Sequence, residues 1–350
     1  MDTHRDGGPG GNRRTHFTPL ADLNGKSVLI TGGTGSFGQA FCKTVLDRYR
    51  LRKLIVFSRD ELKQFEMQTS AAFRPHERVM RYFIGDVRDL GRLEMAFRGV
   101  DFVIHAAAMK QIPAAEYNPF ECIHTNVLGA ENVVRAAIRT DVARVVALST
   151  DKAASPINLY GASKLAADKI FVAARNVVGS DRPMFSVVRY GNVLGSRGSV
   201  VPFFRQRIQQ GASVLPITDP AMSRFWITLP QGVDFVLSCL ALAHGSEIFV
   251  PKLPSMKVTD LARVMAPGLA TEIVGIRQGE KLHEAMITED DARNTLELPD
   301  RYVITRDLAG ATRYHAKQVP VPAGFRYSSD DNTWWLRDDE MRGLLDALPA

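Results

Sequence analysis

The chain has 350 residues, of which 45% are hydrophobic and 23% are charged. This length suggests one large domain or two smaller ones, and the composition is that of a globular protein. No apolar run approaches the roughly 20 residues that span a bilayer. The net charge of +6 comes without a basic block in the body of the chain. We therefore expect no membrane association and no nucleic-acid partner.

Three cysteines, Cys42, Cys122 and Cys239, lie far apart and form no closely spaced pair. An odd number of isolated cysteines argues against a disulfide framework and against a structural zinc site. We expect reduced thiols, a cytoplasmic protein and no bound metal.

Apolar, β-branched runs alternate with longer amphipathic segments between residues 24 and 191. Such runs fit strands buried on both faces, and the intervening segments are long enough for helical crossovers. The pattern predicts an α/β fold with a doubly wound parallel sheet of the Rossmann type. The expected strands are residues 27–31, 54–57, 79–84, 102–105, 144–149 and 185–189.

The two ends of the chain follow other patterns. Residues 1–23 begin with a Gly-rich polar stretch that lacks the apolar core of a signal peptide, which predicts a disordered tail. Residues 192–350 are interrupted by prolines, which predicts a smaller C-terminal lobe for the substrate. Helices are expected near residues 202–211, 258–265 and 338–345, the last in a segment that packs back on the body.

The first chemical motif, TGGTGSFG at residues 31–38, directly follows the first expected strand and opens a helix. Gly32 permits the tight turn, Gly35 lets the backbone approach a pyrophosphate, and Gly38 lets the helix pack close to the sheet. Backbone N–H groups at the helix start then face the phosphates. The motif predicts a dinucleotide site. Its expected cofactor contacts are Gly32, Thr34, Gly35, Ser36, Phe37 and Gly38.

The end of the second strand distinguishes NADP from NAD. An acidic residue usually holds the NAD ribose there, whereas this chain has Ser58 followed by Arg59, with Lys63 one helical turn later. Arg59 can form a charge-assisted fork with a 2′-phosphate, which favours NADP. In the alternative interpretation, Arg59 is a solvated charge and Asp60 holds the ribose.

The third and fourth strands also end in residues that suit a cofactor. Asp86 and Val87 follow the third strand, and Ala106 and Ala107 follow the fourth. Ligands of such sheets bind at the carboxyl ends of the strands. We expect Asp86 to accept a hydrogen bond from the adenine amino group and the alanines to leave room for the cofactor.

A tyrosine and a lysine follow the fifth strand. Tyr160 and Lys164 are four residues apart and therefore lie on one face of a helix. An ammonium near a phenol favours the phenolate and lowers the pKa of the tyrosine. The pair predicts Tyr160 as a base toward a sugar hydroxyl.

These motifs together resemble the extended short-chain dehydrogenase/reductase family, with Thr150 preceding the Tyr160/Lys164 pair. Within it, the chain is most similar to the inverting UDP-N-acetylglucosamine 4,6-dehydratases that begin pseudaminic acid synthesis. The resemblance covers residues 24–302 and resumes near residues 324–336. Its most specific strings are SRDELKQ (58–64), AAAMK (106–110), STDK (149–152), RYGNV (189–193) and GSRGS (195–199).

The resemblance implies a reaction that oxidises the sugar only transiently. Hydride leaves C4 for NADP⁺ while Tyr160 removes the hydroxyl proton, water is then lost across C5 and C6, and the hydride returns to C6. It implies Asp151 as the acid toward O6 and Lys152 as the C5 base, whose reprotonation of C5 on the opposite face would invert that centre. Lys152 can act only if partly neutral, which burial beside Lys164 and a cationic nicotinamide would favour.

The resemblance also implies the substrate contacts. Asn192 would contact the nucleotide sugar, Arg224 and Arg277 would clamp the diphosphate, and Glu280 would hold the uridine ribose. Lys110 would face both the cofactor and the UDP-sugar. A homo-oligomer is expected.

Two other functions remain open at this stage. A nucleotide-sugar 4-epimerase or a retaining dehydratase is the first, although retaining dehydratases carry a glutamate where this chain has Lys152. A non-catalytic NADP-sensing protein on the same fold is the second. Such a protein would be expected to have lost Tyr160, Lys164 or Asp151.

Overall fold

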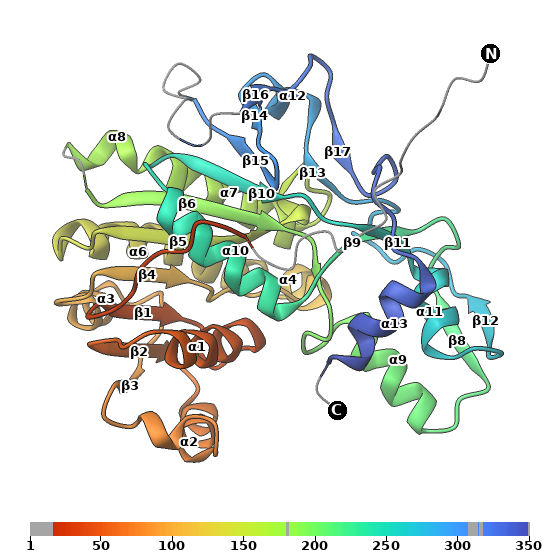
Figure 1. Cartoon of the computed structure of the whole chain (residues 1–350), viewed down its shortest axis with the longest axis horizontal. Coiled ribbons are helices and arrows are strands. Elements are labelled where there is room, and N and C mark those ends of the chain that lie inside the picture. Colours follow the sequence, from red (N-terminus) through yellow and green to blue (C-terminus); the bar gives the residue numbers. More distant parts are fainter. Residues whose placement is uncertain (1–16, 180–181, 307–313, 315–317, 349–350) are drawn as a thin grey trace, which may run out of the picture.

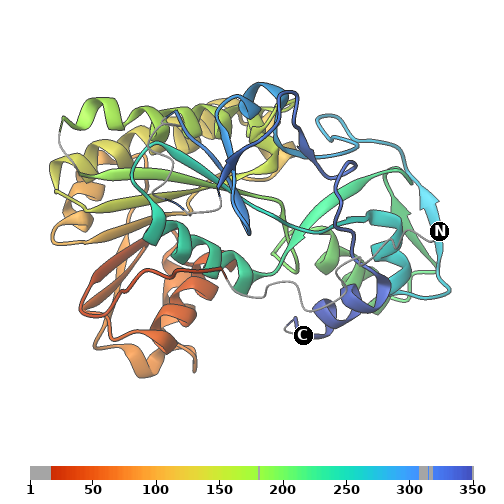
Figure 2. The same ribbon diagram turned by 45° about the horizontal axis from the view of Figure 1, so that its top comes forward.

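The computed structural model describes residues 17–179, 182–306, 314 and 318–348. Residues 1–16, which form most of the predicted disordered tail, lie outside the described residues. The rest forms a large sheet between helices, with a smaller lobe beyond one end of the strands (Figures 1 and 2).

The large sheet has ten strands in the described part of the chain, in the order β16-β14-β15-β10-β6-β5-β4-β1-β2-β3. Seven strands, from β3 to β10 in this order, are mutually parallel. The other three are antiparallel to their neighbours. The parallel strands are β1 (Ser27–Thr31), β2 (Lys53–Ser58), β3 (Met80–Ile84), β4 (Phe102–His105), β5 (Arg144–Thr150), β6 (Met184–Tyr190) and β10 (Glu247–Pro251). The antiparallel strands are β14 (Thr295–Glu297), β15 (Arg301–Ile304) and β16 (Val319–Pro320).

Helices cover both faces of this sheet, which explains why its central strands carry continuous apolar runs. Helix α1 packs beside α10 on one face, and α3, α6 and α7 pack beside one another on the other (Figure 1). The helices around the sheet are α1 (Ser36–Arg48), α2 (Glu61–Thr69), α3 (Leu90–Phe97), α4 (Ile112–Tyr117), α5 (Pro119–Ile123), α6 (Gly129–Arg139), α7 (Leu159–Ala173), α8 (Arg175–Val178), α10 (Leu229–Leu242) and α12 (Glu289–Ala292). The predicted doubly wound parallel sheet is confirmed.

The smaller lobe has two short sheets and three helices among the described residues, around two apolar clusters of its own. Met341 and Leu345 of the last helix pack in one of these clusters, so the end of the chain covers the smaller lobe. The elements of the lobe are β7 (Asn192–Val193), α9 (Val200–Gln209), β8 (Val214–Ile217), β9 (Ser223–Ile227), β11 (Ser255–Lys257), α11 (Val258–Met265), β12 (Ala270–Ile273) and α13 (Asp338–Asp346). A separate antiparallel pair is formed by β13 (Ala285–Ile287) and β17 (Tyr327–Ser328).

The boundary expected at residue 191 does not divide the sheet. Strands β10, β14, β15 and β16 all come from residues 192–350 and extend the same sheet, and α10 packs on its face. The proline-rich pattern of that half concealed these strands, of which β14, β15 and β16 are also short.

Residues 17–23 are ordered, contrary to the predicted tail. Phe17 and Leu23 are buried, and the N–H of Ala21 donates to the carbonyl of Leu237. The ring of Phe17 lies 4.7 Å from that of Phe235, edge to face. Burial of apolar side chains outweighs the cost of ordering this segment.

The structure also bears on the cysteines and on membrane-spanning helices. Cys42, Cys122 and Cys239 are buried and unpaired. Among the residues described, no helix combines the length and the apolar character needed to cross a membrane.

Replacing Phe17 tests whether the N-terminal segment belongs to the core. We expect Phe17→Ala to lower the free energy of unfolding by about 3 kcal/mol, because it empties a site against Phe235. Urea-induced unfolding measures the change. The control Leu20→Ala, at a 37% exposed residue, should cost about 1 kcal/mol or less. An equally small effect at Phe17 would contradict the assignment.

Candidate active site

A cavity of about 840 Å³ lies where the carboxyl ends of the parallel strands meet the smaller lobe. Every residue that the sequence predicted for catalysis or for the cofactor lines it, as do Lys110 and Asn192. Three predicted substrate contacts, Arg224, Arg277 and Glu280, do not line it.

The glycine turn between β1 and α1 forms one wall of the cavity. Gly32 has a φ of +67°, and a Cβ there would lie 2.9 Å from the Cα of Ala107. A Cβ on Gly38 would lie 2.4 Å from the carbonyl oxygen of Gly33, so the helix approaches the turn as closely as backbone allows. No side chain caps α1 at Gly35, which leaves the helix start open to a phosphate. These residues fit a bound dinucleotide.

The end of β2 forms the next part of the wall. The Ser58 hydroxyl lies 3.0 Å from that of Thr34, and the Arg59 guanidinium lies 3.6 Å from Asp86 while its side chain stays 60% exposed. The carboxylate of Asp60 caps α2 by accepting from the Lys63 N–H at 3.0 Å. Hydrogen bonds from Lys63 lower the pKa of Asp60. Asp60 is therefore engaged as a helix cap.

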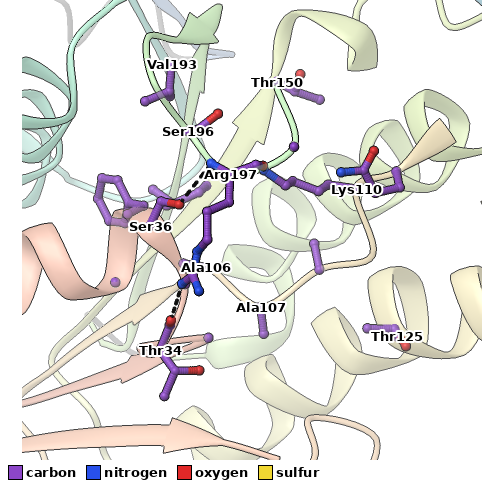
Figure 3. A pocket seen from close by; sticks show the side chains of 18 of the residues that line it. Thr34, Ser36, Ala106, Ala107, Lys110, Thr125, Thr150, Val193, Ser196 and Arg197 are labelled. Carbon is purple, nitrogen blue, oxygen red and sulfur yellow. Dashed lines mark hydrogen bonds between the residues drawn. The ribbon is translucent and has the colours of Figure 1, made fainter. Parts of the chain in front are cut away.

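A loop at residues 195–199 crosses the cavity from the smaller lobe (Figure 3). The Arg197 guanidinium donates to the Thr34 carbonyl at 2.6 Å, and its backbone N–H donates to the Ser36 hydroxyl at 3.2 Å. Lys110 donates to the Arg197 carbonyl at 3.0 Å. Sequence reasoning assigned no role to Arg197. Arg197 lies between Gly195 and Gly198, which both have positive φ. These two glycines mark an exposed turn in the sequence and are the local signal that could have drawn attention to Arg197.

Tyr160 lies in the first turn of α7, which begins where Asn158 accepts a hydrogen bond from the Gly161 N–H at 2.7 Å. Burial raises the pKa of Tyr160 to about 12, opposed by the Lys152 ammonium and by a hydrogen bond with Thr150. The Lys164 ammonium instead donates to the Leu148 carbonyl at 2.7 Å. The expected lowering of the Tyr160 pKa by Lys164 is therefore wrong.

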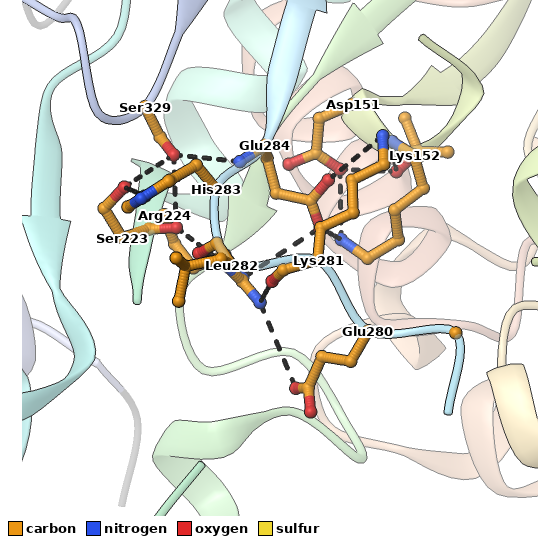
Figure 4. Close-up of polar contacts among 12 residues, drawn as sticks. Asp151, Lys152, Ser223, Arg224, Glu280, Lys281, Leu282, His283, Glu284 and Ser329 are labelled. Carbon is orange, nitrogen blue, oxygen red and sulfur yellow. Dashed lines mark hydrogen bonds and ion pairs between the residues drawn. The ribbon is translucent and has the colours of Figure 1, made fainter. Parts of the chain in front are cut away.

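Lys152 lies between two buried carboxylates at the end of β5 (Figure 4). Its Nζ is 3.1 Å from Asp151 Oδ1 and 3.0 Å from Glu284 Oε1, and both carboxylate side chains are 1% exposed. Burial acts to lower the pKa of Lys152, but Asp151 and Glu284 outweigh it and raise that pKa. Glu284, which sequence reasoning missed, therefore opposes the partly neutral Lys152 that the expected chemistry requires.

The three predicted substrate contacts outside the cavity are engaged elsewhere. Arg224 is buried in β9 and donates to the carbonyls of Ser223, Lys281 and Leu282 (Figure 4). Arg277 is 75% exposed and pairs with Glu280 at 3.3 Å. In this arrangement Arg224 holds the segment that carries Glu284.

Comparison with known proteins identifies the family. Residues 28–306 match the profile of a family described as "Polysaccharide biosynthesis protein". The chain belongs to this family. Its large sheet and glycine turn are those of an extended short-chain dehydrogenase/reductase.

The named relatives of the chain include dehydratases and epimerases. UDP-N-acetylglucosamine 4,6-dehydratase (inverting) of Campylobacter jejuni is 54% identical over 331 residues, which cover 92% of this chain and 98% of the relative. UDP-glucose 4-epimerase of Rickettsia bellii is 41% identical over 334 residues, covering 91% and 95%. The X-ray structure of Pen from Bacillus thuringiensis has a TM-score of 0.84 at 38% identity, covering 92% and 97%. The resemblance seen in the sequence is confirmed.

A buried ion pair supports helix α7, which carries Tyr160 and Lys164, on the side of the large sheet. Asp168, one turn after Lys164 in α7, accepts from the Ser149 hydroxyl at 2.9 Å and pairs with Arg189 at 3.3 Å. The Asp168 and Arg189 side chains are both 2% exposed. The charge of Asp168 opposes the desolvation that lowers the pKa of Lys164. The pair therefore fixes α7 against β5 and β6.

Asp168→Asn should destabilise the fold by about 3 kcal/mol, because it leaves the Arg189 charge buried with incomplete compensation. Chemical denaturation measures this loss. The same change at Asp290, whose side chain is 94% exposed, serves as the control and should have almost no effect. A similar stability for both variants would show that the buried pair does not hold α7.

Proposed function

We propose that the protein is a UDP-N-acetylglucosamine 4,6-dehydratase that inverts C5 and forms a UDP-2-acetamido-2,6-dideoxy-4-hexulose. One observation carries the proposal: Asp151 and Lys152 meet Tyr160 on the wall of a single cavity that fits a dinucleotide. Thus an acid, a base and a hydroxyl-proton acceptor are available to one sugar. The 54% identity to a dehydratase of that name supports the same reaction.

Each protein group has a distinct task in this reaction. When bound, an oxidised nicotinamide dinucleotide would supply the hydride chemistry at C4 and C6 and a positive charge that favours the Tyr160 phenolate. Tyr160 takes the proton of the C4 hydroxyl, and its hydrogen bond with Thr150 orients the phenol. The ketone at C4 acidifies the C5 hydrogen. Lys152 then takes the C5 proton while Asp151 protonates O6, and water leaves.

We also propose NADP as the cofactor. Asp60, the acid that could replace an NAD-type carboxylate, is engaged as a helix cap. The exposed guanidinium of Arg59 lies next to the cavity, with Lys63 on the following helix turn. Three cations, Arg59, Lys63 and Arg197, thus line the part of the wall near Ser58. A 2′-phosphate would offset their charge.

For the nucleotide sugar, we propose Lys110 and Asn192 as contacts from the cavity wall. We propose that the exposed Arg277 contacts the diphosphate and that its half-buried partner Glu280 contacts the uridine ribose. A diphosphate contact from Arg224 requires its hydrogen bonds with backbone carbonyls to break. The product would enter the synthesis of pseudaminic acid-type sugars. We further propose that the enzyme works in the cytoplasm as a homo-oligomer.

A 4-epimerase is the second candidate, because a relative with 41% identity carries that name. Epimerisation needs only Tyr160 and a hydride that returns to C4 on the other face. It gives no task to Asp151 and Lys152, which this chain holds 3.1 Å apart on the cavity wall. Dehydration uses both groups, so it explains more of the site.

Arg59→Ala tests the cofactor. Binding of NADPH should weaken by roughly 1.5–3 kcal/mol, the value of a charged hydrogen bond, whereas binding of NADH should hardly change. Fluorescence titration with the two reduced cofactors measures both affinities. Arg293→Ala, at a side chain 82% exposed, is the matched control. Equal losses for NADPH and NADH would remove Arg59 from the 2′-phosphate site.

Isotope labelling tests the reaction. With UDP-N-acetylglucosamine in deuterated water, NMR should find one deuteron at C5 with inverted configuration, and a C4-deuterated substrate should deliver its label to C6. Lys152→Ala should still oxidise C4 but should slow the loss of water by about 10²–10⁴-fold, the usual contribution of a general base. Lys257→Ala, at an exposed lysine, should behave as wild type.

Other products would point to other reactions. A product that retains the C5 configuration would still indicate a dehydratase but would exclude an inverting one. A 4-epimer that keeps its 6-hydroxyl would exclude dehydration, and a complete lack of label transfer would indicate a binding protein.

A further inference from the structure

Glu284 is a buried carboxylate for which the proposed reaction has no task. It immediately precedes β13, and this region packs against the 3₁₀ turn at Asp151–Ala153 that carries Lys152. Its Oε1 lies 3.0 Å from Lys152 Nζ (Figure 4). Burying a carboxylate away from water is costly unless a cation compensates its charge. The question is therefore which cation compensates Glu284 and what the buried carboxylate does there.

Lys152 is the main partner of that carboxylate. Glu284 Oε2 is buried and accepts no hydrogen bond from the described residues. Lys281 Nζ stands 3.8 Å away and donates to the Ala154 carbonyl at 2.7 Å, while Arg224 Nε is 4.0 Å from Oε1. The two longer contacts supply positive charge without a direct hydrogen bond. The direct contact is therefore the one to Lys152.

We infer that Glu284 is a positioning residue that keeps one proton on the Asp151–Lys152 pair and holds Lys152 Nζ at the cavity wall for the elimination of water. This inference rests on the proposed dehydratase reaction. It adds a residue that acts through Lys152 and not on the sugar.

One proton on the pair is what the elimination requires. The proton moves from Lys152 Nζ to Asp151 Oδ1, 3.1 Å away, which breaks an N–H bond and forms an O–H bond. This single transfer produces both the neutral amine and the protonated acid. The amine then takes the C5 proton, the C5–H electrons form the C5–C6 double bond, and the C6–O bond breaks. Asp151 gives its proton to O6, so water leaves and the original ion pair is restored.

Loss of that proton to solvent would stop the cycle, because Asp151 would have nothing to donate. The charged groups that face Lys152 shift its pKa in opposite directions. Burial and Arg224 favour the neutral amine, whereas Asp151 and Glu284 favour the ammonium and together keep the pKa of Lys152 above its ordinary value. Tyr160 and Lys281 are the other titratable groups close by. Removing the Glu284 charge therefore makes the pair lose its proton at lower pH.

The test is the pH dependence of product formation by the full chain from UDP-N-acetylglucosamine, for wild type and Glu284→Gln, between about pH 6 and pH 12, a range that extends past the ordinary pKa of a lysine. The alkaline limb of the variant should move to lower pH and fall about tenfold per pH unit beyond its midpoint, as for one ionisation. C4 oxidation, followed as cofactor reduction, should keep its rate. Glu289→Gln, an exposed glutamate five residues further along, should keep the wild-type profile.

Glu284→Asp serves as the second variant, since it retains the charge on a shorter side chain. Its alkaline midpoint should fall between those of wild type and Glu284→Gln. If Glu284→Gln does not fold, a midpoint of Glu284→Asp below that of wild type still supports the inference. A reduced rate with an unmoved limb in either folded variant would overturn it and leave Glu284 a structural residue. Failure of wild type to form the C5-inverted product would instead refute the proposed function.

Discussion

The site depends on one interaction: the buried ammonium of Lys152 contacts two buried carboxylates. Asp151 and Glu284 lie 3.1 and 3.0 Å from Nζ and come from parts of the chain 133 positions apart. A buried carboxylate without a cation would be unfavourable, so the end of β5 and the segment before β13 must meet at this point. The same contact joins the end of β5 to the segment before β13 and sets the charge at the cavity wall.

The fold provides the setting for this contact. A doubly wound sheet gathers its functional loops at the carboxyl ends of the strands, and here the glycine turn, the end of β2 and the start of α7 surround one cavity. The smaller lobe completes it. Through Arg197, the loop at residues 195–199 reaches the glycine turn itself at the Thr34 carbonyl. Cofactor contacts and acid–base groups thus share one wall because topology brings them together.

Local patterns in the sequence predicted six of the seven parallel strands closely and missed β10, since strands buried on both faces require continuous apolar runs. Residues 27–31 and 102–105 agree with β1 and β4 at both ends. The motif residues around Gly32 and Tyr160 also reached the cavity, because each motif is positioned by the strand directly before it. Strands β14 to β16 were not predicted because they are short. The burial of Phe17 was not predicted because its neighbours in the sequence are polar and Gly-rich.

The charge of Lys152 could not be predicted in the same way. Sequence proximity suggested Lys164 as the neighbour that would make it neutral, whereas in space Glu284 is the closer influence and has the opposite sign. Nothing local to Glu284 marks it as part of the site. Arg224 was similarly expected on the diphosphate, but its buried position in β9 directs it to the carbonyls of Ser223, Lys281 and Leu282. Long-range pairing of charges has no local pattern.

A direct titration of Lys152 in the unliganded protein tests the central claim. In a chain labelled with ¹³C at the lysine ε carbons, the signal lost in Lys152→Arg identifies this residue. The account predicts that this signal keeps its ammonium chemical shift at about pH 10.4, where an ordinary lysine is half titrated. A midpoint near neutral pH would contradict it, because Asp151 and Glu284 would then not hold the proton on Lys152.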